Sequence, residues 1–304
     1  MKICISQRSS KNRGSSHFLD QLSNALELQG HQIVDAKPDI TLCSVNLTNT
    51  HRCPTVLRID GIYYDRPRES MNKGIKSSLS KANGVIYQSS FSKKMVKHML
   101  GLPKVHNAVI HNGVDRRAYQ TLTKQKQSEH TFVSCAHWRV NKRPKEIASC
   151  FVEAAIPNSI LYMIGEMPKE FIVKHPSVVY LGTLARNEVL QTYKNSDYMI
   201  HICHIDSCPN SVVEGLCAGL PVVCNNISGT PEVVGQSGII ADIDPAFDFH
   251  FVKSMEHLPQ INRNNLIEAI RKIPTSGIVV DRIDLDIQTT AQQYIALFET
   301  VLSK

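Results

Sequence analysis

Hydrophobic and polar positions follow two alternating patterns in the first half of the chain. Short apolar runs bounded by polar or turn residues are typical of strands buried in a parallel sheet. These runs are Ile3–Ser6, His31–Val34, Ile40–Cys43, Val56–Ile59 and Val85–Tyr87. Between them lie segments with apolar residues at helical spacing, such as the one from Phe18 to Leu26, which Gly30 should end. Strands that alternate with helices predict an α/β fold with parallel sheets.

The alternation lapses in a polar stretch over residues 117–131 and then restarts. The strand-like runs of the second half are Phe132–Cys135, Ile160–Ile164, Val178–Leu181, Tyr198–Cys203 and Pro221–Cys224. We therefore predict an N-terminal domain over 1–123 and a C-terminal domain over 124–286. A final helix over 287–304 carries an apolar stripe and is expected to pack back on the N-terminal domain. Two such units in tandem predict a cleft between them, where ligands bind at the carboxyl ends of the strands.

Composition places the chain among folded cytoplasmic proteins. Its 304 residues suffice for two domains, and no apolar run approaches the ~20 residues that span a bilayer. The first residues read as a strand, since their apolar stretch is too short for the core of a signal peptide. The nine cysteines are scattered without a Cys-x-x-Cys pair, which argues against a disulfide scaffold and against a metal site. The densest group of metal-ligand residue types, His201 to His204, is better interpreted as a strand entering a loop.

Positive charge is concentrated at the N-terminal end. Residues 1–122 hold 18 Lys and Arg against 8 Asp and Glu, and the remainder holds 16 against 19. A basic domain suits an anionic partner, such as a phosphorylated acceptor or a membrane surface contacted peripherally, although a solvated basic face explains it equally well. Lys93, Lys94 and Lys97 share one predicted helix on this domain. No nucleic-acid partner is expected, because no helix-turn-helix, zinc finger or aromatic RNA-binding motif is present.

The segment from Asp206 to Cys224 carries the clearest chemistry. A polar loop leads from a strand into a helix that ends near Gly219. The first turn of such a helix presents backbone N–H groups and a partial positive charge, which suit a diphosphate. Asp206 and Glu214 lie eight positions apart and could face opposite ends of one ligand. A purely structural alternative is that Ser211 and Glu214 form a capping box.

This segment resembles the signature of retaining glycosyltransferase family 4, which has the glycosyltransferase-B fold of two Rossmann-like parallel-sheet domains. The shared pattern is an acid, seven residues, a Glu and then Gly-x-Pro-Val-Val. Other stretches resemble the same family in the same order: residues 14–31, 82–93, 109–115, 134–139, 161–165 and 228–234. Each is weak by itself, but together they cover the chain from its start to about residue 240.

The resemblance implies that the C-terminal domain holds a nucleotide-sugar donor. Glu214 matches the residue that binds the ribose hydroxyls, as suits a carboxylate facing a diol. Asp206 matches the acid that contacts the transferred sugar, where the family usually has Glu, so its reach is one methylene shorter. The positions whose backbone would meet the diphosphate are Pro209, Asn210, Ser211 and Val212. The turn from Gly182 to Leu184 resembles the one whose backbone reads the nucleobase.

Two cations match those that stabilise the leaving diphosphate in the family. Arg139 and Lys142 are this pair, and their spacing is shorter than usual, so Arg143 and Lys145 are alternatives to Lys142. In the N-terminal domain, Gly14 and Ser15 match the loop that approaches the donor phosphates. Asp60 lies in the loop that faces the transferred sugar and the acceptor, unless it only caps a turn with Gly61. The stretch from His111 to Val114 is interpreted as hinge structure.

The implied reaction is retention of configuration by attack on the face that the diphosphate leaves. Asp206, Arg139, Lys142 and Asp60 would support it, none of them as a nucleophile and without metal or cofactor. GDP-mannose is favoured slightly over UDP-hexoses on family frequency, and the acceptor would be a glycan or a lipid- or protein-linked group. The oligomeric state is not readable from the sequence.

Four other functions can be compared with the sequence. Two Asp-x-Asp motifs, Asp242 to Asp244 and Asp284 to Asp286, would suit a manganese-dependent glycosyltransferase, but they come late in the chain and are interpreted as surface turns. A dinucleotide-dependent oxidoreductase would need Gly-x-Gly-x-x-Gly after its first strand, and neither half has it. A nucleotide-sugar epimerase on the same fold and a non-catalytic nucleotide-sugar-binding protein remain alternatives.

Overall fold

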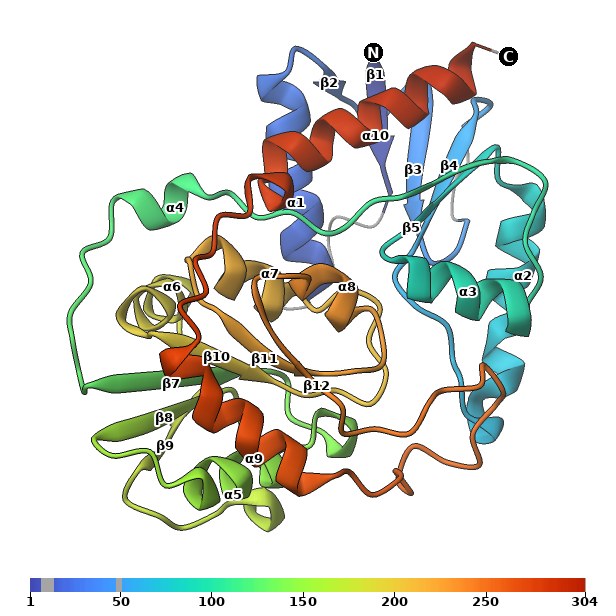
Figure 1. Cartoon of the computed structure of the whole chain (residues 1–304). Coiled ribbons are helices and arrows are strands. Elements are labelled where there is room, and N and C mark those ends of the chain that lie inside the picture. The colour runs from blue at the N-terminus through green and yellow to red at the C-terminus, as the bar shows by residue number, and fades with distance from the viewer. Residues whose placement is uncertain (7–13, 48–50, 304) are drawn as a thin grey trace. The chain divides into compact units, whose positions relative to one another are not determined.

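The computed structural model describes residues 1–6, 14–47 and 51–303. The chain forms two compact units (Figure 1). The first comprises residues 1–115, 248–254 and 283–304, and the second comprises 116–247 and 255–282. Each unit contains a six-stranded sheet in which all the paired strands are parallel. The predicted fold class of two Rossmann-like domains is therefore confirmed.

The sheet of the first unit has the strand order β2-β1-β3-β4-β5-β6. Its strands are β1 (Lys2–Ile5), β2 (Gln32–Ile33), β3 (Ile40–Ser44), β4 (Thr55–Ile59), β5 (Gly84–Tyr87) and β6 (His106–Val109). Every residue of β3, β4 and β5 is buried, as expected for central strands of a sheet covered on both faces. The sequence pattern did not predict β6, because this edge strand alternates half-buried and exposed residues.

The helices of the first unit include one from the far end of the chain. They are α1 (Gly14–Leu28), α2 (Asn72–Lys81), α3 (Ser90–Met99) and α10 (Ile287–Leu302), with the short η1 (Arg66–Met71) and η5 (Ile283–Leu285). Figure 1 shows α10 beside α1, and Tyr294 and Phe298 of α10 share a core with Phe18 of α1. Gly113 permits the close approach of α10, because a Cβ there would lie 2.9 Å from Thr290 Cβ.

The sheet of the second unit has the order β12-β11-β10-β7-β8-β9. Its strands are β7 (His130–Cys135), β8 (Ser159–Ile164), β9 (Val178–Gly182), β10 (Tyr198–His201), β11 (Val222–Asn225) and β12 (Gly238–Ala241). Its helices are α4 (Arg117–Gln120), α5 (Pro144–Ala154), α6 (Arg186–Asn195), α7 (Asn210–Cys217), α8 (Thr230–Val234) and α9 (Arg263–Lys272), with η2 (Val140–Lys142), η3 (Lys169–Phe171) and η4 (Ile273–Thr275). Helices α5 and α9 pack together over a core that includes Phe132 and Phe151.

The chain passes from one unit to the other at positions that the hydrophobic pattern does not mark. The sequence suggests a boundary between residues 123 and 124, whereas the structure divides the chain between Asp115 and Arg116. The polar stretch lies on the second unit, where Lys124 Nζ donates to Asp197 Oδ1 at 2.5 Å. Residues 248–254 belong to the first unit because Val252 exchanges backbone hydrogen bonds with Tyr64 and Arg66, both at 2.9 Å.

Candidate functional site

The loops that follow β7 and β10 lie at the same edge of the second sheet. The two strands are parallel neighbours, so their carboxyl ends meet there. The loop after β7 enters η2 and contains Arg139 and Lys142, and the loop after β10 contains Asp206 and leads into α7. The backbone N–H of His204 donates to Asn141 O at 2.9 Å and ties the two loops together.

Lys142 and Asp206 form an ion pair between Nζ and Oδ2. Burial alone would raise the pKa of Asp206, but Lys142 lowers it below its ordinary value. Burial likewise opposes the charge of Lys142, but Asp206 and Cys203 raise the pKa of its ammonium group. Both partners therefore stay charged at neutral pH. Burial and the nearby Lys142 lower the pKa of His201 to about 3, so this imidazole is neutral.

Glu214 lies in α7 with 7% of its surface exposed. Arg186 Nη1 donates to its Oε1 at 2.6 Å. Burial raises the pKa of Glu214, and Arg186 and then Tyr193 oppose that rise. Arg186 is the first residue of α6 and lies two residues after Leu184, the end of the predicted base-reading turn. Sequence reasoning missed Arg186, because an arginine at the start of a helix gives no signal that a carboxylate lies beside it.

The structure at the start of α7 limits which of the four predicted backbone positions can donate an N–H to a diphosphate. Pro209 is the N-cap residue and has no N–H, and the Val212 N–H donates to Pro209 O at 3.0 Å. Asn210 and Ser211 are the first two residues of the helix, and both are half-buried. The capping-box interpretation of Ser211 and Glu214 is wrong, because Ser211 lies inside the helix instead of at its N-cap.

The other predicted donor residues of the second unit lie at loop positions. Arg139 is exposed and precedes η2. Gly182 ends β9 with a φ of 65° and accepts a hydrogen bond from the Gly165 N–H at 2.7 Å. A residue with a Cβ would be strained there, as in any left-handed position. Leu184 follows two residues later and is half-buried.

Asp60 of the first unit belongs to a buried polar cluster. It follows β4 and forms an ion pair with Arg58, whose side chain is 1% exposed. Arg58 Nη2 donates to Asn112 Oδ1 at 2.8 Å, and Gln88 Nε2 donates to Asp60 Oδ1 at 3.1 Å. Burial raises the pKa of Asp60, and Arg58 and Gln88 oppose that rise. The described contacts of Asp60 are therefore with a buried arginine and a glutamine, which the turn-cap interpretation did not predict.

The glycine loop of the first unit is described only in part. Gly14 and Ser15 are the first residues of α1. Residues 7–13, which the sequence predicts to be a loop, lie outside the described residues.

Two expectations about charged residues are corrected. Arg143 cannot replace Lys142 at a ligand, because its side chain is buried and donates to Asp244 Oδ1 at 2.9 Å. The first Asp-x-Asp motif is not a surface turn throughout, since Asp242 is exposed but the Asp244 side chain is fully buried. In the second motif, Asp286 caps α10 by accepting the Gln288 N–H at 2.8 Å. Within the described ranges, no group of three or more His, Cys, Asp and Glu side chains is placed to hold a metal ion.

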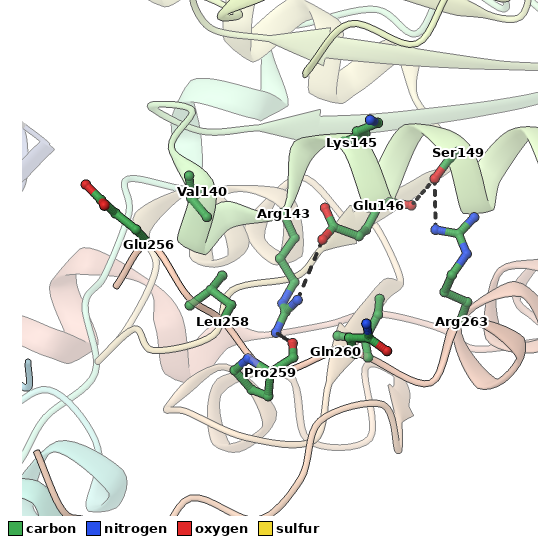
Figure 2. A pocket seen from close by; sticks show the side chains of 11 residues that line it. Val140, Arg143, Lys145, Glu146, Ser149, Glu256, Leu258, Pro259, Gln260 and Arg263 are labelled. Carbon is green, nitrogen blue, oxygen red and sulfur yellow. Dashed lines mark hydrogen bonds and ion pairs between the residues drawn. The ribbon is translucent and has the colours of Figure 1, made fainter. Parts of the chain in front are cut away.

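A cavity of about 550 Å³ lies beside the start of α5 (Figure 2). Arg143, Lys145, Glu146 and Arg263 supply its charged side chains together with Glu256. Neither Asp206 nor Glu214 lines it. The cavity is therefore distinct from the cluster of predicted donor residues.

Comparison with known proteins finds a family match in the second unit. Residues 131–258 match the family described as glycosyl transferases group 1, and this range contains Lys142, Asp206 and Glu214. Over 79 residues the chain is 28% identical to O-antigen chain mannosyltransferase B of Escherichia coli. That match covers 25% of this chain and 21% of the mannosyltransferase, so it spans about a fifth of that relative's length.

Solved structures share the fold over nearly the whole chain. Sucrose-phosphate synthase from Thermosynechococcus elongatus superimposes with a TM-score of 0.68 at 12% identity, over 99% of this chain and 96% of that one. HepE of Anabaena, in complex with UDP and glucose, gives a TM-score of 0.62 at 15% identity, over 99% and 100%. At such identities the likeness establishes the architecture. The chain is therefore identified as a protein of the glycosyltransferase-B fold whose second unit carries the group 1 glycosyltransferase match.

Proposed function

We propose that the protein is a retaining, metal-independent glycosyltransferase that transfers a hexose from a nucleotide-diphosphate sugar. One observation carries this proposal: Asp206 and Glu214, eight positions apart, each face a cation in the unit that matches glycosyl transferases group 1. An acid in the loop before α7 and an acid within that helix, each paired with a lysine or an arginine, suit a ligand that combines hydroxyl groups with phosphates.

Each residue has a distinct role in this proposal. Glu214 accepts hydrogen bonds from the ribose hydroxyls, and Asp206 accepts them from the transferred sugar. Lys142 and Arg139 neutralise the charge that develops on the diphosphate as its bond to the anomeric carbon breaks. The acceptor hydroxyl then bonds to that carbon on the same face, and its proton passes to a diphosphate oxygen. Asp60 orients the sugar or the acceptor.

The donor is proposed to be GDP-mannose in preference to a UDP-hexose. The mannosyltransferase relative supports mannose, whereas HepE was solved with UDP and glucose. GDP-mannose and UDP-glucose therefore both belong in the first binding experiment. The alternative functions are those of a nucleotide-sugar epimerase and of a non-catalytic nucleotide-sugar-binding protein.

The acceptor is proposed to be an anionic glycan or lipid-linked group, met at a basic face of the first unit. Residues 66–104 contain nine Lys and Arg against one acidic residue. Lys73 and Lys76 of α2 and Lys94 and Lys97 of α3 are all exposed. None of the described helices is long and apolar enough to cross a membrane. We propose peripheral contact of this face with an anionic membrane and a cytoplasmic location.

Calorimetry in EDTA with GDP-mannose, GDP-fucose, UDP-glucose, UDP-GlcNAc and NAD tests the donor assignment. Binding of one nucleotide sugar without metal, followed by transfer to a glycan acceptor with release of the nucleoside diphosphate, supports the proposal. Conversion of the bound donor into its epimer would instead identify an epimerase. Binding without turnover would leave a binding protein, and binding of NAD alone would overturn the assignment.

A further inference from the structure

The residue after Lys142 has an unusual backbone. Arg143 has φ 48° and ψ 46°, the left-handed conformation that residues other than glycine seldom adopt. It lies between η2 and the first residue of α5, Pro144. Such a conformation persists only where the surrounding structure holds it in place, and such positions cluster at functional sites.

The side chain of Arg143 provides that hold. It is 2% exposed, and its Nη2 donates to Asp244 Oδ1 and to Pro259 O, both at 2.9 Å. Figure 2 shows Arg143 reaching from the start of α5 to Pro259, with Glu146 beside it. Asp244 and Pro259 come more than 100 positions later in the chain. The loop after β7 is thus anchored to segments from a distant part of the sequence.

Asp244 extends the same network to the loop that carries Asp206. Asn225, the last residue of β11, donates from Nδ2 to Asp244 Oδ2 at 2.7 Å and to Cys203 O at 2.9 Å. Asn225 Oδ1 also accepts the Cys203 N–H at 3.2 Å. Cys203 lies three residues before Asp206, so one buried network holds both loops of the Lys142–Asp206 pair.

From this geometry we infer that Arg143, anchored by Asp244, is a positioning residue that aims Lys142 at the donor diphosphate. The inference rests on the proposed function. The peptide between Lys142 and Arg143 is fixed on one side by the Arg143 anchor. Its own N–H, that of Arg143, donates to Val140 O at 3.0 Å, and the preceding Lys142 N–H donates to Arg139 O at 2.9 Å. Rotation of that peptide would turn the lysine away from Asp206.

The variants separate the effect of the Arg143 side chain from the effect of its left-handed backbone conformation. Arg143→Gly accepts the left-handed conformation but loses the anchor. Asp244→Asn keeps the shape of its side chain and removes the charge that holds the guanidinium. Lys142→Met removes the cation that is being aimed. Arg263→Met is the matched control, because Arg263 also contacts α5, through Ser149 and Glu153, outside the network.

The measurement compares a nucleoside diphosphate with its nucleoside on each variant by calorimetry, using UDP with uridine and GDP with guanosine. Arg143→Gly and Asp244→Asn should each weaken diphosphate binding at least tenfold and change nucleoside binding less than twofold. Adding Lys142→Met to Arg143→Gly should cause little further loss, because both changes remove one interaction. Arg263→Met should bind both ligands like the wild type.

Other outcomes would overturn the inference. Equal losses for nucleoside and diphosphate would mean that the network only maintains the fold, and no loss for either would mean that Lys142 needs no anchor. Should Arg143→Gly fail to fold, Arg143→Lys answers the same question, since lysine keeps the buried charge but lacks the planar guanidinium. If the wild type binds neither diphosphate, the proposed function itself fails. If Lys142→Met loses the phosphate-dependent affinity and the two anchor variants do not, only the inference about Arg143 fails.

Discussion

Replacement of Glu214 by alanine should weaken nucleotide binding, and only for nucleotides that carry both ribose hydroxyls. Glu214 is 7% exposed, and Arg186 Nη1 donates to its Oε1 at 2.6 Å. A hydrogen bond to a charged group contributes about 1.5–3 kcal/mol. Since every 1.4 kcal/mol is tenfold in affinity, the dissociation constant should rise by about ten- to 150-fold.

The stability of the protein should suffer less than the burial of Glu214 suggests. Removing one partner of a fully buried ion pair costs about 3–5 kcal/mol, because an uncompensated charge remains. The Arg186 side chain is 37% exposed, so water can solvate it once Glu214 is gone. The cost in free energy of unfolding should therefore stay below that range. Folded Glu214→Ala protein should be available for titration.

A double comparison isolates the ribose contact. The nucleoside diphosphate and its 2′-deoxy analogue are titrated into the wild type, Glu214→Ala and Glu188→Ala. Glu188 is an exposed acid on α6 that accepts the Ala185 N–H at 2.7 Å, so its removal makes the same change in charge without removing the proposed ribose contact. Loss of the 2′-hydroxyl should weaken binding to the wild type and to Glu188→Ala, but not to Glu214→Ala.

Two results would refute the reasoning. An equal penalty for the deoxy analogue in all three proteins would show that Glu214 does not contact the ribose. An equal loss of affinity in Glu188→Ala and Glu214→Ala would mean that the loss follows from the change in net charge and not from a contact with the ribose.

Three further outcomes are expected. Gly113→Ala should lower the free energy of unfolding by about 1–3 kcal/mol in chemical denaturation, because its Cβ would lie 2.9 Å from Thr290 Cβ. Gly74→Ala in α2, whose Cβ would meet a side-chain oxygen 3.1 Å away, should be neutral or slightly stabilising, and equal losses would contradict the packing argument. Burial and Lys142 lower the pKa of His201 from 6.5 to about 3, so only the unfolded chain takes up this proton as the pH falls below about 6.5. Wild-type stability should therefore fall more steeply than that of His201→Gln between pH 7 and 5, and parallel curves would refute this. Transfer rates should agree in EDTA and in manganese; a rate that needs manganese would revive the Asp-x-Asp motifs as metal-site candidates.

The strands could be predicted wherever they lie in the middle of a sheet. A central strand of a parallel sheet is buried on both faces and therefore reads as a continuous apolar run, as in Val85–Tyr87 of β5 and Val222–Cys224 of β11. The two missed strands, β6 and β12, are at the edges of their sheets and include exposed residues. Positions that contact solvent need not be apolar, so the apolar pattern of an edge strand is weaker than that of a central strand.

The candidate site could be predicted only as far as it is local in sequence. Asp206 and Glu214 share one loop and helix, so their spacing was visible. Their cations come from elsewhere: Lys142 follows β7, and Arg186 opens α6. Only the fold shows that each acid has its own partner.

The sequence by itself therefore determined the α/β class, the central strands and the two acids, because these depend on neighbouring residues and on which of them avoid water. The tertiary structure alone decided the unit boundary after Asp115, the assignment of residues 248–254 to the first unit, and the buried pairing of Arg143 with Asp244. These features join segments far apart in the chain. No local pattern specifies such contacts, since they arise only when parallel strands bring the ends of distant loops to one edge of a sheet.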